Sequence, residues 1–166
     1  MAKYPSLSLR LQANNLSKDL ELVAYCLMPN HFHFLLKQKT ASSISKFMKQ
    51  IANAYTRYFN SKYNRTGSLF SGRFKAVLVD KNEVLLHLSR YIHLNPLVAG
   101  LVKELKDYPW SSYHSYLSSK EIDICKKEII LDQFKSPQEY QAFVKNHIDY
   151  AKELEKIKHF TLDEPF

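Results

Sequence analysis

The sequence of 166 residues is poor in glycine and cysteine and has no long apolar run, and each shortage excludes a class of protein. Three glycines are too few for a collagen-like or low-complexity chain. Two cysteines, Cys26 and Cys125, form neither a disulfide framework nor a zinc-type spacing. The longest uncharged stretch, residues 22–36, contains two histidines, a proline and an asparagine, so it is no membrane-spanning helix. Without a secretory signal in the first twenty residues, we expect a soluble, cytoplasmic protein with no membrane partner.

Acidic residues are missing between Glu21 and Asp80, whereas nine basic residues lie there. The chain carries a net charge of +8, which divides into +11 for residues 1–120 and −3 for residues 121–166. Uncompensated cations repel one another, so this segment indicates a polyanionic partner, and nucleic acid is the one we expect. A solvated basic face without a partner is the alternative. The nine bases are Lys37, Lys39, Lys46, Lys49, Arg57, Lys62, Arg65, Arg73 and Lys75.

Aromatic residues are interleaved with these bases, at positions 47, 55, 58, 59, 63, 70 and 74. Such rings stack on unpaired bases, but at helical spacing they more often belong to a core. Candidate contacts to DNA are Lys46, Lys49 and Arg57 in the basic segment, together with Arg73 and Lys75 after a glycine-containing turn. A solvated basic loop is the alternative for the last two.

Apolar patterning predicts two strands and a helix in the first half of the chain. Residues 20–27 and 31–37 are apolar and β-prone on either side of Pro29-Asn30, which predicts a hairpin or neighbouring strands. Apolar residues three and four apart predict a helix over 41–62, with Ser42 or Ser43 as its cap. A short strand is expected over 74–79.

The second half of the sequence is predicted to be helical. A helix is expected from residue 80 or 82 to about residue 94, because Pro96 disfavours its continuation. Trp110 is expected to begin a short helix and to dock on the core. Ser136 begins a charged helix predicted to reach about residue 158. The change in charge near residue 120 divides the chain into a domain of residues 1–120 and a C-terminal helical extension of residues 121–166.

His31-Phe32-His33 is the first group of residues that indicates chemistry. Alternate residues of a strand point to the same face, so the two imidazoles lie together and could chelate one divalent ion such as Mg²⁺, Mn²⁺ or Zn²⁺ with a third group. On spacing alone, two ordinary surface or hydrogen-bonded histidines are the commoner outcome.

Tyr91 to Pro96 is the second group. On a helix, Tyr91 and Asn95 share one face, and His87 extends the same stripe. A phenol is a poor nucleophile unless a metal ion or another cation favours its anion. An amphipathic helix with a buried tyrosine is the alternative.

Four segments in order give the sequence a resemblance to a known family: residues 25–36 (YCLMPNHFHFLL), 67–74 (GSLFSGRF), 91–96 (YIHLNP) and 110–112 (WSS). Together they resemble the single-tyrosine transposases with a His-hydrophobic-His motif, which are the insertion-sequence enzymes and their REP-associated relatives. The resemblance covers about residues 20–118. It implies an α+β fold with a ferredoxin-like antiparallel sheet and helices on one face.

The resemblance also implies an activity. Members cleave and rejoin single-stranded DNA with hairpin or palindromic elements, using a divalent metal (Mg²⁺ or Mn²⁺) and a covalent 5′-phosphotyrosine. His31 and His33 match the metal-binding pair, Asn95 matches the third polar ligand, and Tyr91 matches the nucleophile. A homodimer is a possible assembly within such a family.

The segment before Tyr25 departs from the family pattern, which has a further strand and helix there. About twenty residues precede the match, so we expect the first strand to be missing and a sheet edge to be exposed. A truncated or domesticated single-stranded DNA-binding protein without catalysis is therefore the alternative to an active transposase.

Overall fold

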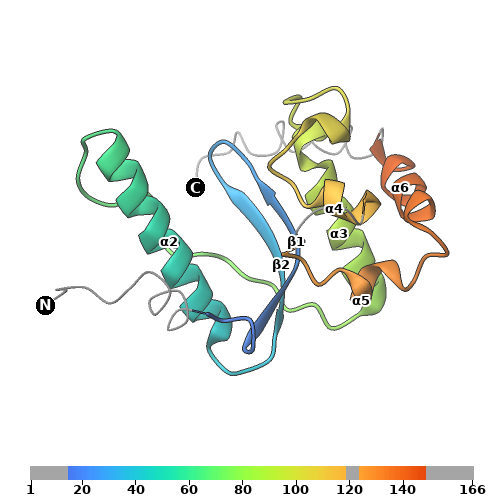
Figure 1. Ribbon diagram of the computed structural model, residues 1–166, viewed down its shortest axis with the longest axis horizontal. Coiled ribbons are helices and arrows are strands. Elements are labelled where there is room, and N and C mark those ends of the chain that lie inside the picture. Colours follow the sequence, from blue (N-terminus) through green and yellow to red (C-terminus); the bar gives the residue numbers. More distant parts are fainter. Residues whose placement is uncertain (1–14, 119–123, 149–166) are drawn as a thin grey trace, which may run out of the picture. The chain divides into compact units, whose positions relative to one another are not determined.

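The computed structural model describes residues 15–118 and 124–148, with the elements arranged as in Figure 1. Two strands, β1 (Leu20–Leu27) and β2 (Phe32–Gln38), form an antiparallel sheet. The longer helices are α2 (Ser43–Lys62), α3 (Asn82–Val98) and α6 (Pro137–Lys145). Shorter helical elements are η1 (Leu105–Asp107), α4 (Tyr113–Leu117) and α5 (Glu128–Leu131). This mixture confirms the predicted α+β class.

The described residues form two compact units. One consists of residues 15–21 and 36–78. The other consists of residues 22–35, 79–118 and 124–148. The first unit contains α2, which confirms the helix predicted over 41–62; Ser42 stands at its N-cap position with a φ of 64°, but its side chain makes no capping hydrogen bond. The second unit contains α3 to α6. The division predicted at residue 120 stays a prediction.

The β1–β2 hairpin confirms the two strands predicted on either side of Pro29-Asn30. The backbone N–H of Met28 donates to the carbonyl of His31 over 2.9 Å and closes the turn. Cys26 on β1 is fully buried, as expected of a small core residue, and burial raises the pKa of its thiol to about 12. Its thiol is therefore protonated at neutral pH.

Residues 110–112 pair with the side of β1 that faces away from β2. The N–H of Leu27 donates to the carbonyl of Trp110 over 2.8 Å, and the N–H of Ser112 donates to the carbonyl of Tyr25 over 3.0 Å. Trp110 thus contributes its backbone to the sheet while its side chain is 62% exposed. The expectation that Trp110 docks on the core is wrong, and Tyr113, at the start of α4, is buried instead.

Helix α3 runs through Pro96 to Val98, so the end predicted near residue 94 is wrong. Pro96 lacks the N–H that would bond to the preceding turn, but Pro96 and Leu97 are buried, and their packing offsets that loss. Gly100, with a φ of 69°, supplies the left-handed residue after the helix.

The strand expected over residues 74–79 is absent from the described structure, where this segment has no regular secondary structure. Val77 and Leu78 are exposed, and only Val79 packs against the core. An apolar run becomes a strand only where another strand pairs with it, and none of the described residues does so here.

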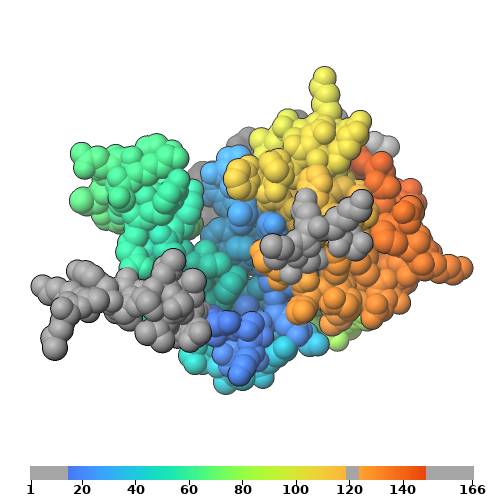
Figure 2. Space-filling view, in the orientation of Figure 1, coloured from blue at the N-terminus to red at the C-terminus, as the bar shows by residue number. Residues whose placement is uncertain are grey.

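The core of the second unit joins β1 to the helices around α3. Helix α6 contacts both α3 and α4, and the yellow and orange regions of Figure 2 adjoin on the face in view. Ser136 caps α6 as predicted, because its hydroxyl accepts from the N–H of Glu139 over 3.2 Å. The predicted continuation of this helix beyond residue 148 lies outside the described residues. Within the described ranges, no helix is long and apolar enough to cross a bilayer.

Candidate active site

His31 and His33 lie together at the start of β2. His31 immediately precedes the strand and is exposed, whereas His33 is half-buried. The centroids of their rings are 4.9 Å apart and the rings meet edge to face. Metal–nitrogen bonds are about 2 Å long, so two imidazoles at this separation could both reach one ion.

A hydrogen bond orients the ring of His31. Its Nδ1 lies 2.7 Å from the amide oxygen of Asn30. Because that oxygen accepts, Nδ1 is the protonated nitrogen and Nε2 keeps its lone pair. Histidines that bind metals are commonly held in this way, with the distal nitrogen free to ligate.

Tyr91 projects from α3 toward this histidine pair. Its ring centroid is 5.6 Å from that of His33, and the two rings meet nearly edge to face. The tyrosine side chain is 43% exposed, so a substrate can approach it from solvent. Both residues belong to the same compact unit, and the structure therefore brings His31, His33 and Tyr91 together.

Asn95 lies one turn after Tyr91 on α3 and is half-buried. Its amide nitrogen Nδ2 donates to the backbone carbonyl of Tyr91 over 2.8 Å. This hydrogen bond holds the side chain of Asn95 through its amide nitrogen. The amide oxygen, which is the atom that binds cations, takes no part in this bond.

The side chains of His31, His33 and Asn95 carry donor atoms of the kind that divalent ions bind. No cluster of three or more histidine, cysteine or carboxylate side chains able to hold a metal occurs in the described ranges. Two imidazoles with one amide oxygen would leave further positions for water and a phosphate oxygen, which suits Mg²⁺ or Mn²⁺. These three residues are therefore chemically able to hold the metal, and their roles stay predictions.

His93 forms a buried polar network that the sequence did not reveal. It lies on α3 between the candidate nucleophile and Asn95, and it is completely buried. Its Nδ1 is 2.8 Å from the hydroxyl of Tyr140 on α6, and its Nε2 is 2.8 Å from the hydroxyl of Ser112. Burial lowers the pKa of His93 to about 3, so the ring is neutral at pH 7.

Ser112 connects three of the four segments that carry the family resemblance. Its hydroxyl contacts His93, accepts from the N–H of Tyr25 over 2.9 Å, and lies 3.1 Å from the carbonyl of Tyr25. The strand that leads to the histidine pair is thus tied to the helix that carries Tyr91.

Arg90 and His87 extend the polar surroundings of α3. Arg90 is 6% exposed; its guanidinium lies over the ring of Phe143 at 4.3 Å and 2.6 Å from Nδ1 of His87. Burial lowers the pKa of Arg90. His87 is exposed and contacts Arg90.

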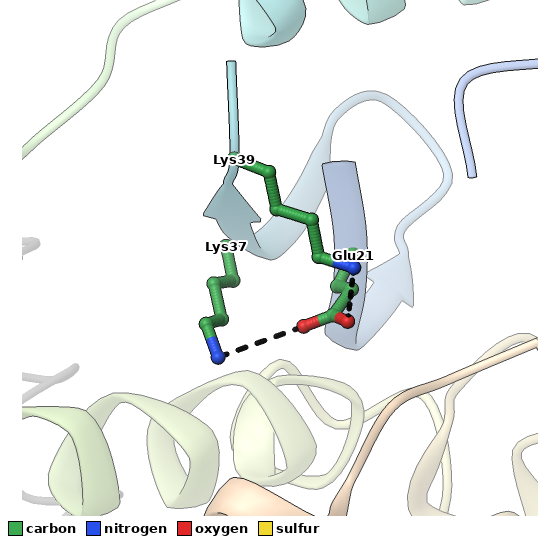
Figure 3. Close-up of polar contacts among 3 residues, drawn as sticks. All are labelled: Glu21, Lys37 and Lys39. Atoms are coloured by element: carbon green, nitrogen blue, oxygen red, sulfur yellow. Dashed lines mark ion pairs between the residues drawn. The ribbon is translucent and has the colours of Figure 1, made fainter. Parts of the chain in front are cut away.

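The candidate DNA contacts lie in the other compact unit. Lys46, Lys49 and Arg57 are exposed on α2, and Arg73 and Lys75 are exposed in the segment after it. Two other bases of the acid-free stretch share one carboxylate, because Glu21 binds Lys37 at 3.7 Å and Lys39 at 2.5 Å, which leaves one net positive charge among the three (Figure 3). In the described structure, no ion pair neutralises the five candidates.

Comparison with known proteins identifies the family of the chain. The family described as "Transposase IS200 like" matches residues 6–95, which is more than half of the chain. The chain belongs to this family of transposases.

A curated relative has a similar description. The chain is 31% identical over 106 residues to a protein of Haemophilus influenzae named "Putative REP-associated tyrosine transposase". The match covers 57% of this chain and 59% of the relative, so the chain spans less than two thirds of the relative's length. No solved structure matches the chain.

Proposed function

We propose that the chain acts in DNA transposition by cleaving and rejoining single-stranded DNA, with Tyr91 as the nucleophile. The observation that carries the proposal is the 5.6 Å separation between the ring centroids of Tyr91 and His33 in a chain of the transposase family. A partly exposed phenol beside two imidazoles is able to meet a phosphodiester held at the same place.

The proposed reaction exchanges one phosphate ester for another. The phenolic oxygen of Tyr91 attacks phosphorus, its O–P bond forms, and the bond from phosphorus to the 3′ oxygen breaks. The phenol loses a proton and the 3′ oxygen gains one, leaving a 5′-phosphotyrosine and a free 3′ hydroxyl. Attack by a 3′ hydroxyl reverses these changes, so rejoining needs no nucleotide.

His31, His33 and the amide oxygen of Asn95 would hold a divalent metal. Such an ion, when bound, supplies charge stabilisation to a phosphate under attack. The chain's own contribution is positional: Asn30 orients His31, and the bond from Asn95 to the Tyr91 carbonyl holds the amide one turn from the nucleophile. DNA with hairpin or palindromic elements is the proposed substrate, and a homodimer is a possible form of the enzyme.

Tyr91→Phe tests the nucleophile. The protein with Mn²⁺ and hairpin-bearing single-stranded DNA is expected to form a covalent adduct, which a denaturing gel resolves. The phenylalanine variant lacks the attacking oxygen, so we expect no adduct. Removal of metal by a chelator, or His31→Ala with His33→Ala, is expected to reduce adduct formation by at least about 100-fold, as loss of a charge-stabilising group commonly does.

Ser45→Ala, which removes an exposed hydroxyl on α2, is the control and should form the adduct. An adduct that survives Tyr91→Phe would remove Tyr91 from the role. Binding of single-stranded DNA without any adduct, at every metal tested, would favour the non-catalytic alternative.

A further inference from the structure

Along one face of α2, the side chains change from buried near the start of the helix to exposed near its end. Met48 is buried and Ile51 half-buried in the first half of α2, and Tyr55 follows Ile51 by one turn on the same face. The tyrosines of the second half and of the C-cap are exposed: Tyr55 is 48%, Tyr58 56% and Tyr63, at the C-cap, 57% exposed. The core role expected of helically spaced rings thus does not apply to these three tyrosines.

Lys62 lies between two of these rings. Its Nζ is 5.6 Å from the ring centroid of Tyr58 and 5.4 Å from that of Tyr63, and it donates to the Tyr58 hydroxyl over 3.3 Å. Positions 55, 58 and 62 share one helical face, and the C-cap residue Tyr63 adds its ring beside Lys62. We call these four residues the tyrosine–lysine surface; they belong to the green region of Figure 2.

The segment after α2 folds back to support this surface. Asn64, with a φ of 48°, ends the helix, and the N–H of Arg65 bonds to the carbonyl of Asn60. The amide of Asn60 also donates to the carbonyl of Gly67 over 2.9 Å. The loop thereby brings the ring of Phe70 to 6.2 Å from that of Tyr55, and the rings are held by the fold.

The charge around the surface selects its partner. Residues 43–79, which are α2 and most of the loop after it, contain no acidic residue, and Arg65 adds a second cation 5.7 Å from the ring of Phe59. A second copy of this surface would bring like charges together. A polyanion that presents flat rings satisfies both the cations and the aromatic faces.

We propose that the tyrosine–lysine surface binds unpaired nucleotides of single-stranded DNA, with bases stacking on the tyrosine rings and a phosphate contacting Lys62. Duplex DNA fits poorly, because its bases already stack on one another. The inference rests on the proposed function in one respect, which is that the substrate is the same single-stranded DNA. It adds a binding site in the unit that does not contain Tyr91.

Paired substitutions of Tyr58 and Tyr63 separate stacking from general apolar contact. Phenylalanine keeps the aromatic face, whereas leucine keeps apolar bulk without it. In a Tyr91→Phe background, which cannot cleave, we expect the double leucine variant to bind an unstructured oligonucleotide roughly 5- to 100-fold more weakly and the double phenylalanine variant to bind it nearly as well as the parent. Fluorescence anisotropy at fixed salt measures both.

The remaining measurements identify other partners. Binding to a blunt duplex is expected to change little between the leucine and phenylalanine pairs. Equal affinity of both pairs for single-stranded DNA would overturn the inference, as would tighter binding of RNA of the same sequence. A concentration-dependent dimer in sedimentation that the leucine pair abolishes would instead make the surface an interface between copies. Because the adduct assay uses Tyr91 and this assay lacks it, either proposal can fail alone.

Discussion

Among single residues, His93 has the strongest structural constraint near the candidate site. It is completely buried, both ring nitrogens lie 2.8 Å from a hydroxyl, and it lies two residues from Tyr91. A neutral ring in this position satisfies Ser112 and Tyr140 at once. Its effect on the site is therefore indirect: it holds the helix that carries the nucleophile.

His93→Phe tests this role through stability and pH. The variant keeps a ring but removes one hydrogen-bond partner from each of two buried hydroxyls, so we expect the free energy of unfolding at pH 7 to fall by about 2–4 kcal/mol. The unfolded histidine binds a proton below about pH 6.5 while the folded one resists it down to about pH 3. Stability of the parent should therefore decline as pH falls through that window.

Urea unfolding at pH 7 and pH 4.5 measures both effects. The difference between parent and variant should shrink at the lower pH, because only the parent contains this buried imidazole. His114→Phe, at a half-buried position on α4, is the control and should lower stability less. A constant difference at both pH values would contradict the pKa assigned to His93.

At the scale of elements, α6 is part of the core around α3. Tyr140 is fully buried, its hydroxyl donates to Ser89 over 3.2 Å, and burial raises its pKa. Phe143 follows Tyr140 by about one turn, and the guanidinium of Arg90 lies over its ring at 4.3 Å. Residues of the predicted C-terminal extension thus stabilise the helix that carries Tyr91.

Tyr140→Ala is expected to destabilise the protein by about 3–5 kcal/mol, because it leaves a cavity between α3, α4 and α6. Tyr140→Phe retains the ring and should lose only about 1–2 kcal/mol with the hydroxyl. Thermal or urea unfolding followed by circular dichroism measures the change. Little effect of the alanine variant would show that α6 adds nothing to the stability of α3.

Local sequence patterns predicted the elements whose formation depends on neighbouring residues. The β1–β2 hairpin and α2 lie within one or two residues of their expected ranges, because alternation and helical spacing act over short distances. Pro96 and Trp110 were placed wrongly, since burial of one and backbone pairing of the other depend on distant segments. The histidine motif was visible in the sequence, whereas the connection of His93 to Ser112 was not.

At the scale of the whole molecule, positive charge is distributed unevenly. The net charge of +8 arises from the first 120 residues, and within the acid-free stretch Lys37 and Lys39 share an ion pair with Glu21. The exposed bases Lys46, Lys49 and Arg57 on α2 have no such partner in the described structure. They are the ones expected to displace counterions from DNA.

Replacing Lys46, Lys49 and Arg57 by glutamine tests this assignment. Each phosphate contact adds about 0.7 to the slope of log affinity against log salt for a single strand, so the triple variant should lower that slope by up to roughly 2. Lys37→Gln with Lys39→Gln, in bases already paired with Glu21, is the matched control and should change it less. Equal changes in both variants would mean that the ion pairs do not matter to binding.

The pairing of residues 110–112 with β1 has a further consequence for the behaviour of the protein in concentrated solution. A strand at the edge of a sheet has unpaired backbone N–H and C=O groups, with which strands of other chains can pair to form fibrils. Here the backbone of residues 110–112 pairs with the outer edge of β1, while Lys37 and two imidazoles lie in or beside β2. These polar side chains, together with backbone groups of β1 that are already hydrogen-bonded, disfavour the pairing of further strands with this small sheet and so disfavour aggregation.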